Sequence, residues 1–162
     1  MENLPRRKPL RLRDYDYSQA GYYFVTVCVK DGECILCRGE QGSPEGVANF
    51  TLSKTGEVVE AAINNIEKYY SNIRIDHYTI MPNHLHMIVI ISMDQNGRTL
   101  FAPTLSRIIK QFKGYVTKQI GYSIWQKSYH DHIVRNEQAY QEIYNYIETN
   151  PLKWKLDRYY RD

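Results

Sequence analysis

Two histidines separated by one residue are the most chemically informative feature of the sequence. His84 and His86 lie at the start of an apolar run that spans residues 84–91. Because side chains alternate along a strand, both imidazoles would point to one face of a sheet and Leu85 to the other. The pair can supply two ligands to a metal ion. The motif alone is weak, and two partly exposed strand histidines are the simpler interpretation.

A helix expected at residues 104–120 offers candidates for a third ligand and a nucleophile. Tyr115 and Gln119 are four residues apart, so they share one face of this helix. An amide oxygen suits a hard cation, and a set of histidine and amide ligands without thiolate favours Mg²⁺ or Mn²⁺ over a closed structural zinc site. A metal ion that polarises a phosphoryl oxygen beside a tyrosine hydroxyl is typical of nucleophilic phosphoryl transfer.

Positive charge is concentrated in two segments, although Lys and Arg number 21 against 18 Asp and Glu, a net charge of +3. The segments are an arm at residues 1–14 and the 104–120 helix, and no acidic residue occurs from 101 to 119. Such segments suit a polyanion, because each neutralised phosphate releases a counterion. A solvated tail is an equally good interpretation of the arm. The predicted DNA contacts are Arg6, Arg7, Lys8, Arg11 and Arg13 in the arm and Arg107, Lys110, Lys113 and Lys118 in the helix.

An aromatic and polar segment follows this helix. In it, Trp125 is a candidate for stacking on an unpaired base, with burial in the core as the alternative. His130, Asp131 and His132 either contact DNA, orient the site or form a structural turn network.

The remaining pattern places these residues in one α+β domain over 1–162, with a basic arm at 1–14 and a basic, aromatic tail at 151–162. Residue types and periodicity predict strands at 22–30, 34–38, 47–52, 75–81 and 84–91, and helices at 55–70, 104–120 and 136–148. A ferredoxin-like antiparallel sheet with helices packed on it fits this order.

Composition narrows the class of protein. Hydrophobic residues make up 43% of the chain, which is typical of a globular domain. No apolar run reaches the ~18–20 residues that cross a bilayer, and the basic N-terminus lacks the apolar run of a secretory signal. The three cysteines form neither a disulfide framework nor a complete zinc site, so we expect a cytoplasmic protein without a membrane partner. With 15 tyrosines, none is identified as catalytic by its presence alone.

Four motifs, taken in order, resemble a known family. MPNHLHMIV, FKGYVTKQ, IWQKSYHDHIVR and YIETNP occur within a stretch from about Tyr22 to Trp154 that resembles the REP-associated tyrosine transposases. Those proteins are similar to the single-strand tyrosine transposases of small insertion sequences, in the HUH nuclease superfamily. The resemblance implies a ferredoxin-like core and metal-dependent cleavage of single-stranded DNA. It also implies His84, His86 and Gln119 as metal ligands and Tyr115 as the nucleophile.

The same resemblance implies a reaction and a partner. Cleavage would form a 5′-phosphotyrosine link and a free 3′-OH, and a second 3′-OH would rejoin the strands without an external energy source. The expected partner is single-stranded or hairpin DNA, bound by a monomer or a homodimer. One alternative is a hairpin-binding protein that has lost cleavage activity. Another is a zinc hydrolase, which would need a further histidine or carboxylate ligand, with His130 and His132 as candidates.

Overall fold

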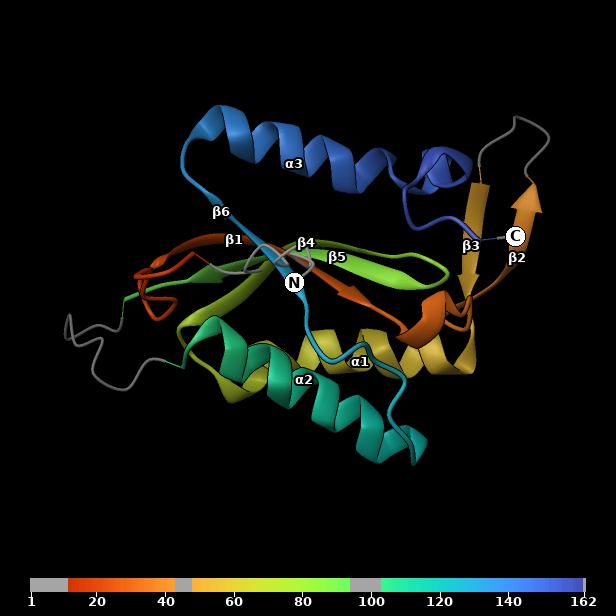
Figure 1. Ribbon diagram of the computed structural model, residues 1–162, viewed down its shortest axis with the longest axis horizontal. Helices are drawn as coiled ribbons and strands as arrows, with labels where there is room; N and C mark the ends of the chain where they lie inside the picture. Colours follow the sequence, from red (N-terminus) through yellow and green to blue (C-terminus); the bar gives the residue numbers. More distant parts are fainter. Residues whose placement is uncertain (1–11, 43–47, 94–102, 162) are drawn as a thin grey trace, which may run out of the picture.

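A four-stranded antiparallel sheet forms the centre of the computed structural model, which describes residues 12–42, 48–93 and 103–161 (Figure 1). Its strands are β1 (Gly21–Cys28), β4 (Ile73–Ile80), β5 (His84–Ile91) and β6 (His130–Val134), in the spatial order β4-β5-β1-β6. If these four strands are numbered 1 to 4 by their order in the chain, they lie in the spatial order 4-1-3-2 from β6 to β4. This is the ferredoxin-like arrangement, so the predicted fold class is confirmed.

Helices cover both faces of the sheet. Two of them, α1 (Lys54–Tyr69) and α2 (Leu105–Ile120), pack together on one face, and α3 (Glu137–Thr149) lies on the opposite face (Figure 1). A separate hairpin of β2 (Cys37–Gly42) and β3 (Ala48–Leu52) stands at one end of the sheet. Two short 3-10 helices, η1 (Lys30–Gly32) and η2 (Pro151–Leu156), complete the described elements. No described helix has the length and apolar character needed to cross a membrane.

The alternation of side chains along β5 assigns each residue to one face. Leu85 and Met87 pack into the main core with α1 and α2, whereas Ile88 packs into a second, smaller core with α3. His84 and His86 have the same parity as Ile88, so their rings face α3. The prediction that the two histidines share one face is therefore confirmed.

Strand β6 is absent from the strands that the sequence predicts. Its five residues are mostly polar and carry no clear alternation. It forms because β1 offers an edge, along which Tyr22 pairs with Val134 and Thr26 with His130. The expected positions of α2 and α3 are close to those observed, because each begins at a polar cap. Thr104 accepts a hydrogen bond from the backbone N–H of Arg107, and Asn136 accepts one from that of Ala139.

Two helical glycines lie in opposite surroundings. In α1, a Cβ on Gly56 would lie 2.0 Å from the carbonyl oxygen of Leu36, so the helix approaches the backbone that precedes β2 too closely for any side chain. In α2, a Cβ on Gly114 would meet nothing within 4 Å among the described residues. Gly56 is therefore required by packing, whereas Gly114 is not.

Candidate active site

The two histidines of β5 meet at the centre of a buried polar cluster. Their Nε2 atoms are 3.1 Å apart, and the residues are 0% and 1% exposed. The Nδ1 atom of His84 lies 2.8 Å from Oδ1 of Asn83. The amide nitrogen of Asn83 donates to the carbonyl oxygens of Gly32 and Tyr159, which leaves its Oδ1 as an acceptor. We therefore assign the proton of His84 to Nδ1 and a lone pair to Nε2.

His86 is held from its other side by β1. Its Nδ1 atom lies 2.8 Å from the hydroxyl of Thr26, which pairs with it across the sheet. When this hydroxyl accepts the proton of Nδ1, the Nε2 atom of His86 also carries a lone pair. Two lone pairs that face each other repel, and a cation or a proton donor between them relieves this repulsion. The hydrogen bonds to Asn83 and Thr26 thus point both Nε2 atoms at one location.

Burial lowers the pKa of both histidines to about 3. The positive charge of Arg158 lowers the pKa of His84 further, and His84 itself is the next cause for His86. Both rings are therefore neutral near pH 7, which is the form that binds metals. The contact of 3.9 Å between Nε2 of His84 and Oδ2 of Asp157 is consequently not an ion pair.

Asp157 and Asn150 bring oxygen atoms to the histidine pair. One ligand atom from each of His84, His86 and Asp157 lies within 4.8 Å of the other two, so these residues have the geometry of a metal site. Asn150 is 3% exposed and donates to Oδ2 of Asp157 over 2.8 Å. Its Oδ1 atom is buried and has no hydrogen-bond partner among the described residues. A buried amide oxygen without a partner, beside a carboxylate and two neutral imidazoles, suits a divalent cation.

Tyr146 reaches the same cluster from α3. Its hydroxyl lies 3.4 Å from Nε2 of His86, and its ring packs edge-on against Phe24. The residue is 41% exposed, so a substrate has access to the phenol. Burial of the ring is the main cause that raises its pKa. The negative charge of Asp157 raises the pKa further, and the positive charge of Arg158 lowers it.

The segment after η2 covers the histidines. The ring of Tyr159 lies over His84, with 4.5 Å between centroids, and the guanidinium of Arg158 lies 4.8 Å from the centre of the Tyr159 ring. A cavity of about 500 Å³ opens beside this cover, between α3, β1 and β6. Its lining includes His86, His130, His132, Glu142, Tyr146 and Arg158. Tyr146 therefore borders a cavity that a substrate can enter.

Tyr115 and Gln119 do not belong to this cluster. The buried stripe of α2 packs in the main core with Leu85, and Tyr115 packs against that same core. Gln119 is exposed. The sheet therefore separates both residues from His84 and His86. The prediction of a single site containing the histidines, Gln119 and Tyr115 is wrong, because a helix on one face cannot reach side chains on the other.

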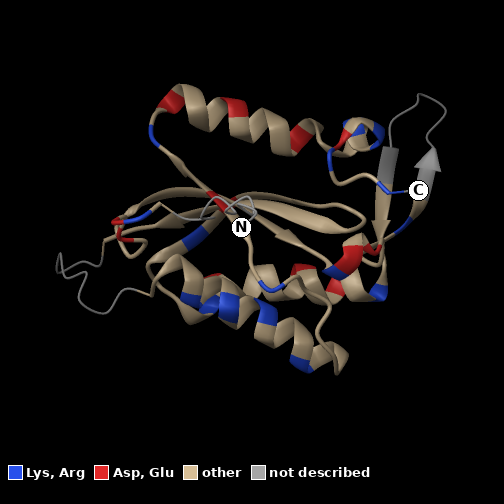
Figure 2. Cartoon of the chain, in the orientation of Figure 1, with Lys and Arg blue, Asp and Glu red and all other residues tan. Residues whose placement is uncertain are grey.

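The predicted DNA contacts fall into several groups. Arg6, Arg7, Lys8 and Arg11 lie outside the described residues, and Arg13 is exposed. On α2, three exposed cations line one groove, and Figure 2 shows the concentration of positive charge along this helix. They are Arg107, Lys110 and Lys118. Lys113 differs, since its ammonium donates to the carbonyl oxygens of Gln126 and Ser128.

Trp125 is 6% exposed and packs on Phe112, with 5.6 Å between centroids. A buried ring has no free face for a base, so the expectation that Trp125 stacks on DNA is not met. His130, Asp131 and His132 all line the cavity beside Tyr146, and the carboxylate of Asp131 also interacts with the hydroxyl of Tyr17.

Sequence reasoning missed Tyr146, Asn150, Asp157 and Arg158. A signal for the first two was present, because Tyr146 and Asn150 have the same four-residue spacing that linked Tyr115 to Gln119. The sequence contains four such tyrosine–amide pairs, and two of them, those of Tyr115 and Tyr146, begin within expected helices. Spacing cannot decide which of these two faces the histidines. No comparable signal marks Asp157 or Arg158, which lie in a segment without regular periodicity.

Comparisons with known proteins identify relatives of this chain by sequence and by fold. No family model matches the chain. An uncharacterized protein of Haemophilus influenzae is 32% identical over 96% of this chain and 94% of its own length. A second protein of that organism, named "Putative REP-associated tyrosine transposase", is 20% identical over 91% of this chain and 84% of its own length.

Two solved structures share the fold. One is a REP-associated tyrosine transposase bound to a REP hairpin, with a TM-score of 0.64 and 21% identity over 88% of this chain and 73% of that one. The other is named a "putative transposase" from Deinococcus radiodurans, with a TM-score of 0.50 and 15% identity over 86% of this chain and 95% of that one. The chain therefore belongs to one family with the uncharacterized Haemophilus protein, and it is related in sequence and fold to the REP-associated tyrosine transposases.

Proposed function

We propose that this protein is a transposase that nicks and rejoins single-stranded DNA next to a hairpin, with Tyr146 as the nucleophile. The observation that carries the proposal is the contact of 3.4 Å between the Tyr146 hydroxyl and Nε2 of His86. Through this contact, the partly exposed phenol of Tyr146 lies at the edge of the buried group formed by His84, His86 and Asp157. The relationship to REP-associated tyrosine transposases supplies the reaction class and the partner.

The reaction follows from the atoms in the cluster. The exposed Tyr146 hydroxyl gives its proton to solvent water, from which the leaving 3′ oxygen later takes one, and the Tyr146 oxygen forms a bond to the phosphorus atom of a DNA phosphodiester. The bond from phosphorus to the 3′ oxygen breaks, and that oxygen leaves and is protonated to a 3′-OH. The 5′ side of the break remains attached as a phosphotyrosine. Attack by another 3′-OH on this link reverses the chemistry and rejoins DNA, so no external energy source is needed.

Each residue of the cluster has a separate part in this proposal. His84, His86 and Asp157 would hold the ion, and Asn150 would orient Asp157 and offer its free amide oxygen. A bound Mg²⁺ or Mn²⁺ would polarise a phosphoryl oxygen and stabilise the charge of the transition state. Arg158 adds a fixed positive charge beside Tyr146, which favours the phenolate needed for attack. The raised pKa of Tyr146 in the free protein explains why such help is required.

A hairpin-binding protein without cleavage activity is the second candidate. The burial of both histidines favours it, and so does the ring of Tyr159 over His84, because both shield the Nε2 atoms from solvent in the free protein. A zinc hydrolase is the third candidate, since Asp157 supplies the carboxylate ligand that such a site requires. Copurification of tightly bound zinc would favour the hydrolase over both the transposase and the hairpin-binding protein.

One experiment separates the first two candidates. The protein is incubated with single-stranded hairpin DNA and either Mg²⁺ or Mn²⁺, and the products are resolved under denaturing conditions. A covalent protein–DNA adduct on Tyr146, identified by peptide mass, supports the transposase. Binding of the hairpin without adduct in either metal supports the inactive binder and rejects the proposed reaction.

A further inference from the structure

A second cavity lies on the face of the sheet opposite the histidines, between α1 and α2. Its volume is about 220 Å³, smaller than the pockets that take drug-sized ligands. Aromatic rings and side-chain amides dominate the lining, which includes Asn65, Tyr69, Tyr70, Gln111, Phe112 and Tyr115. Flat rings together with amides are the groups that proteins use to stack and hydrogen-bond an unpaired base.

The hydroxyl of Tyr70 lacks a partner in this cavity. It is buried and has no hydrogen-bond partner among the described residues. Burial raises the pKa of Tyr70, and the opposing effect of Arg107 is the smaller one, so the phenol stays protonated near pH 7 and is available as a donor. Leaving such a donor unpaired costs about 1–3 kcal/mol, and a ligand with an acceptor atom would recover part of that cost.

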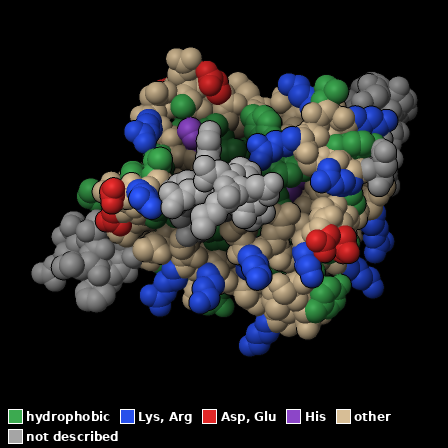
Figure 3. Space-filling view, in the orientation of Figure 1, with side chains coloured by type: hydrophobic (Ala, Val, Ile, Leu, Met, Phe, Trp, Pro, Cys, Tyr) green, Lys and Arg blue, Asp and Glu red, His purple; other side chains and the backbone are tan. Residues whose placement is uncertain are grey.

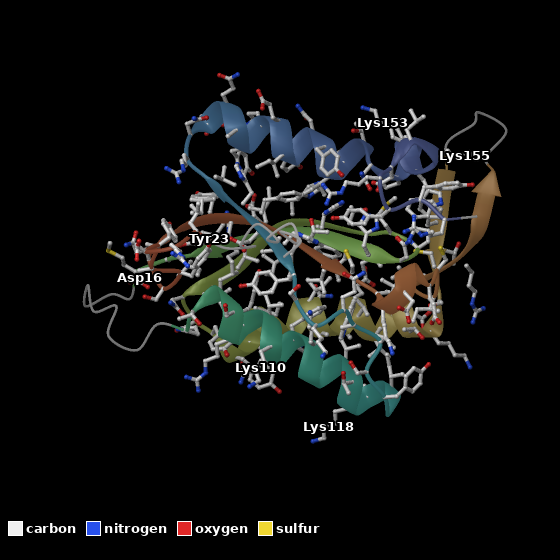
Figure 4. The ribbon with its side chains drawn as sticks, in the orientation of Figure 1. Asp16, Tyr23, Lys110, Lys118, Lys153 and Lys155 are labelled. Atoms are coloured by element: carbon white, nitrogen blue, oxygen red, sulfur yellow. The ribbon has the colours of Figure 1, made fainter. Side chains whose placement is uncertain are left out.

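A cationic groove continues from the cavity along the outer side of α2. The groove is lined by Arg107, Lys110 and Lys118, and it shares Gln111 and Tyr115 with the cavity. Figure 3 shows a row of positive side chains along the lower side of the molecule, where α2 lies, and Figure 4 shows Lys118 pointing away from the sheet. A row of cations beside an aromatic cavity matches a phosphate backbone beside a base.

The acidic residues of α1 do not oppose this charge. Glu60 accepts a hydrogen bond from the hydroxyl of Tyr78, and Glu67 accepts one from the backbone N–H of Ile75. Both carboxylates are thus tied to β4. The third acidic residue of α1, Glu57, lies in its first turn, and none of the three lines the cavity. α2 itself contains no acidic residue.

We propose that the cavity between α1 and α2 binds one unpaired base of a nucleic-acid strand, whose phosphates follow the groove of α2. The proposal rests on the proposed function, in that the strand would belong to the DNA that Tyr146 cleaves. It adds a second binding site on the face that carries no catalytic group. Tyr69 and Tyr115 stack on the base, and the Tyr70 hydroxyl, which is buried in the free protein, turns into the cavity to donate to it.

Fluorescence anisotropy with labelled oligodeoxythymidylate tests this site at low salt. Tyr69→Ala and Tyr115→Ala each remove one stacking ring, so each should weaken binding roughly 5- to 150-fold. Tyr122→Ala is the matched control, because Tyr122 is 63% exposed, close to the 71% of Tyr69, and lies outside the cavity. Circular dichroism establishes that each variant is folded. In a second measurement, a strand of 2-aminopurine should lose fluorescence on binding to the wild type and keep it with Tyr115→Ala.

Each outcome decides the proposal. If both variants bind like the wild type, or if Tyr122→Ala loses as much affinity, the cavity is not a base site. If Tyr69→Ala changes a dimer to a monomer and leaves DNA affinity intact, the cavity is occupied by a second copy of the chain, which also overturns the proposal. Failure of the proposed reaction can be distinguished from failure of this base site. Tyr146→Phe should bind the oligonucleotide like the wild type, even if neither protein forms a covalent adduct.

Discussion

The hydroxyl of Tyr146 lies 3.4 Å from Nε2 of His86, although the two residues are separated by sixty positions in the sequence. Helix α3 and strand β5 bring them together on one face of the sheet, and Asn150 follows one helical turn after Tyr146. Tyr115 has the same relationship to Gln119 on the other face, where neither His84 nor His86 is within reach. The catalytic assignment therefore depends on which face a helix covers.

Replacement of two tyrosines distinguishes these faces. Tyr146→Phe should abolish the covalent protein–DNA adduct, because the attacking oxygen is removed. Tyr115→Phe should leave adduct formation intact. The Tyr146 variant should lose less than about 1 kcal/mol of unfolding free energy, since the hydrogen bond that it removes is long and partly exposed. Denaturing electrophoresis and thermal melting measure both effects. Adduct retained by Tyr146→Phe and absent from Tyr115→Phe would restore the assignment made from the sequence.

Metal binding should depend on Asp157 and not on Gln119. Asp157→Asn keeps the size of the side chain and removes its negative charge, so Mn²⁺ affinity measured by calorimetry should fall about tenfold or more. Gln119→Ala serves as the control and should bind Mn²⁺ like the wild type. An equal loss in both variants would mean that the metal is bound elsewhere.

A partly buried hydrogen bond between α3 and β4 should contribute to the stability of the protein. The hydroxyl of Tyr140 donates to Asp76 on β4, a charged acceptor, so Tyr140→Phe should lower the unfolding free energy by about 1.5–3 kcal/mol. Tyr144→Phe is the control, because the ring that stacks on His77 is retained. A shift in melting temperature of equal size in both variants would contradict this prediction.

The contribution of Tyr140 should also vanish at high pH. Its hydrogen bond to Asp76, followed by burial, raises the pKa of Tyr140 to about 12, above its usual value near 10. A raised pKa means that the folded protein binds the proton more tightly than the unfolded chain. The stabilisation should therefore be complete below pH 10 and disappear as the pH rises through about 12. Denaturation curves of wild type and Tyr140→Phe should converge over that interval.

The same substitution at two glycines should have opposite effects on stability. Gly114→Ala adds a methyl group in open space and removes the helix penalty of glycine, so the unfolding free energy should rise by up to about 1 kcal/mol. Gly56→Ala places a methyl group 2.0 Å from the carbonyl oxygen of Leu36, so the helix must shift and the protein should be destabilised. Urea denaturation compares the two, and stabilisation by Gly56→Ala would show that α1 does not approach this backbone in solution.

The lysines of α2 should contribute to the salt dependence of DNA binding. Replacing Lys110 and Lys118 with glutamine should reduce the slope of log affinity against log salt by about 0.7 for each phosphate of a single strand that is no longer neutralised. Lys153 and Lys155 lie on the other side of the molecule and provide the control pair (Figure 4). An unchanged slope in the α2 variant would indicate that its charges do not touch phosphates.

Most of the fold was accessible from the sequence because its signals are local. Apolar runs and helical stripes predicted the main strands and helices, and the order of these elements indicated a ferredoxin-like sheet. Strand β6 was not predicted, because its pairing energy comes from the edge of β1, which lies more than a hundred residues earlier in the chain. The tight approach of Gly56 to Leu36 was equally invisible, since no local pattern records it.

The site was accessible only in part, for a related reason. Alternation along one strand correctly placed His84 and His86 together, because both belong to the same local element. Choosing between Tyr115 and Tyr146 required knowledge of which helix packs on which face. That choice depends on tertiary packing, in which α2 contributes to the main core and α3 to the second, smaller core.

The opposite positions of α2 and α3 set a requirement for the path of the DNA. A strand whose base lies between α1 and α2 and whose phosphate lies at Tyr146 must pass around an edge of the sheet, because it cannot pass through it. Its unpaired stretch therefore has a minimum length. A shorter strand would occupy either place but not both, and it would lack the gain in affinity that comes from tethering the two sites. The thickness of the sheet would then act as a ruler that fixes how far from the anchored base the DNA is cut.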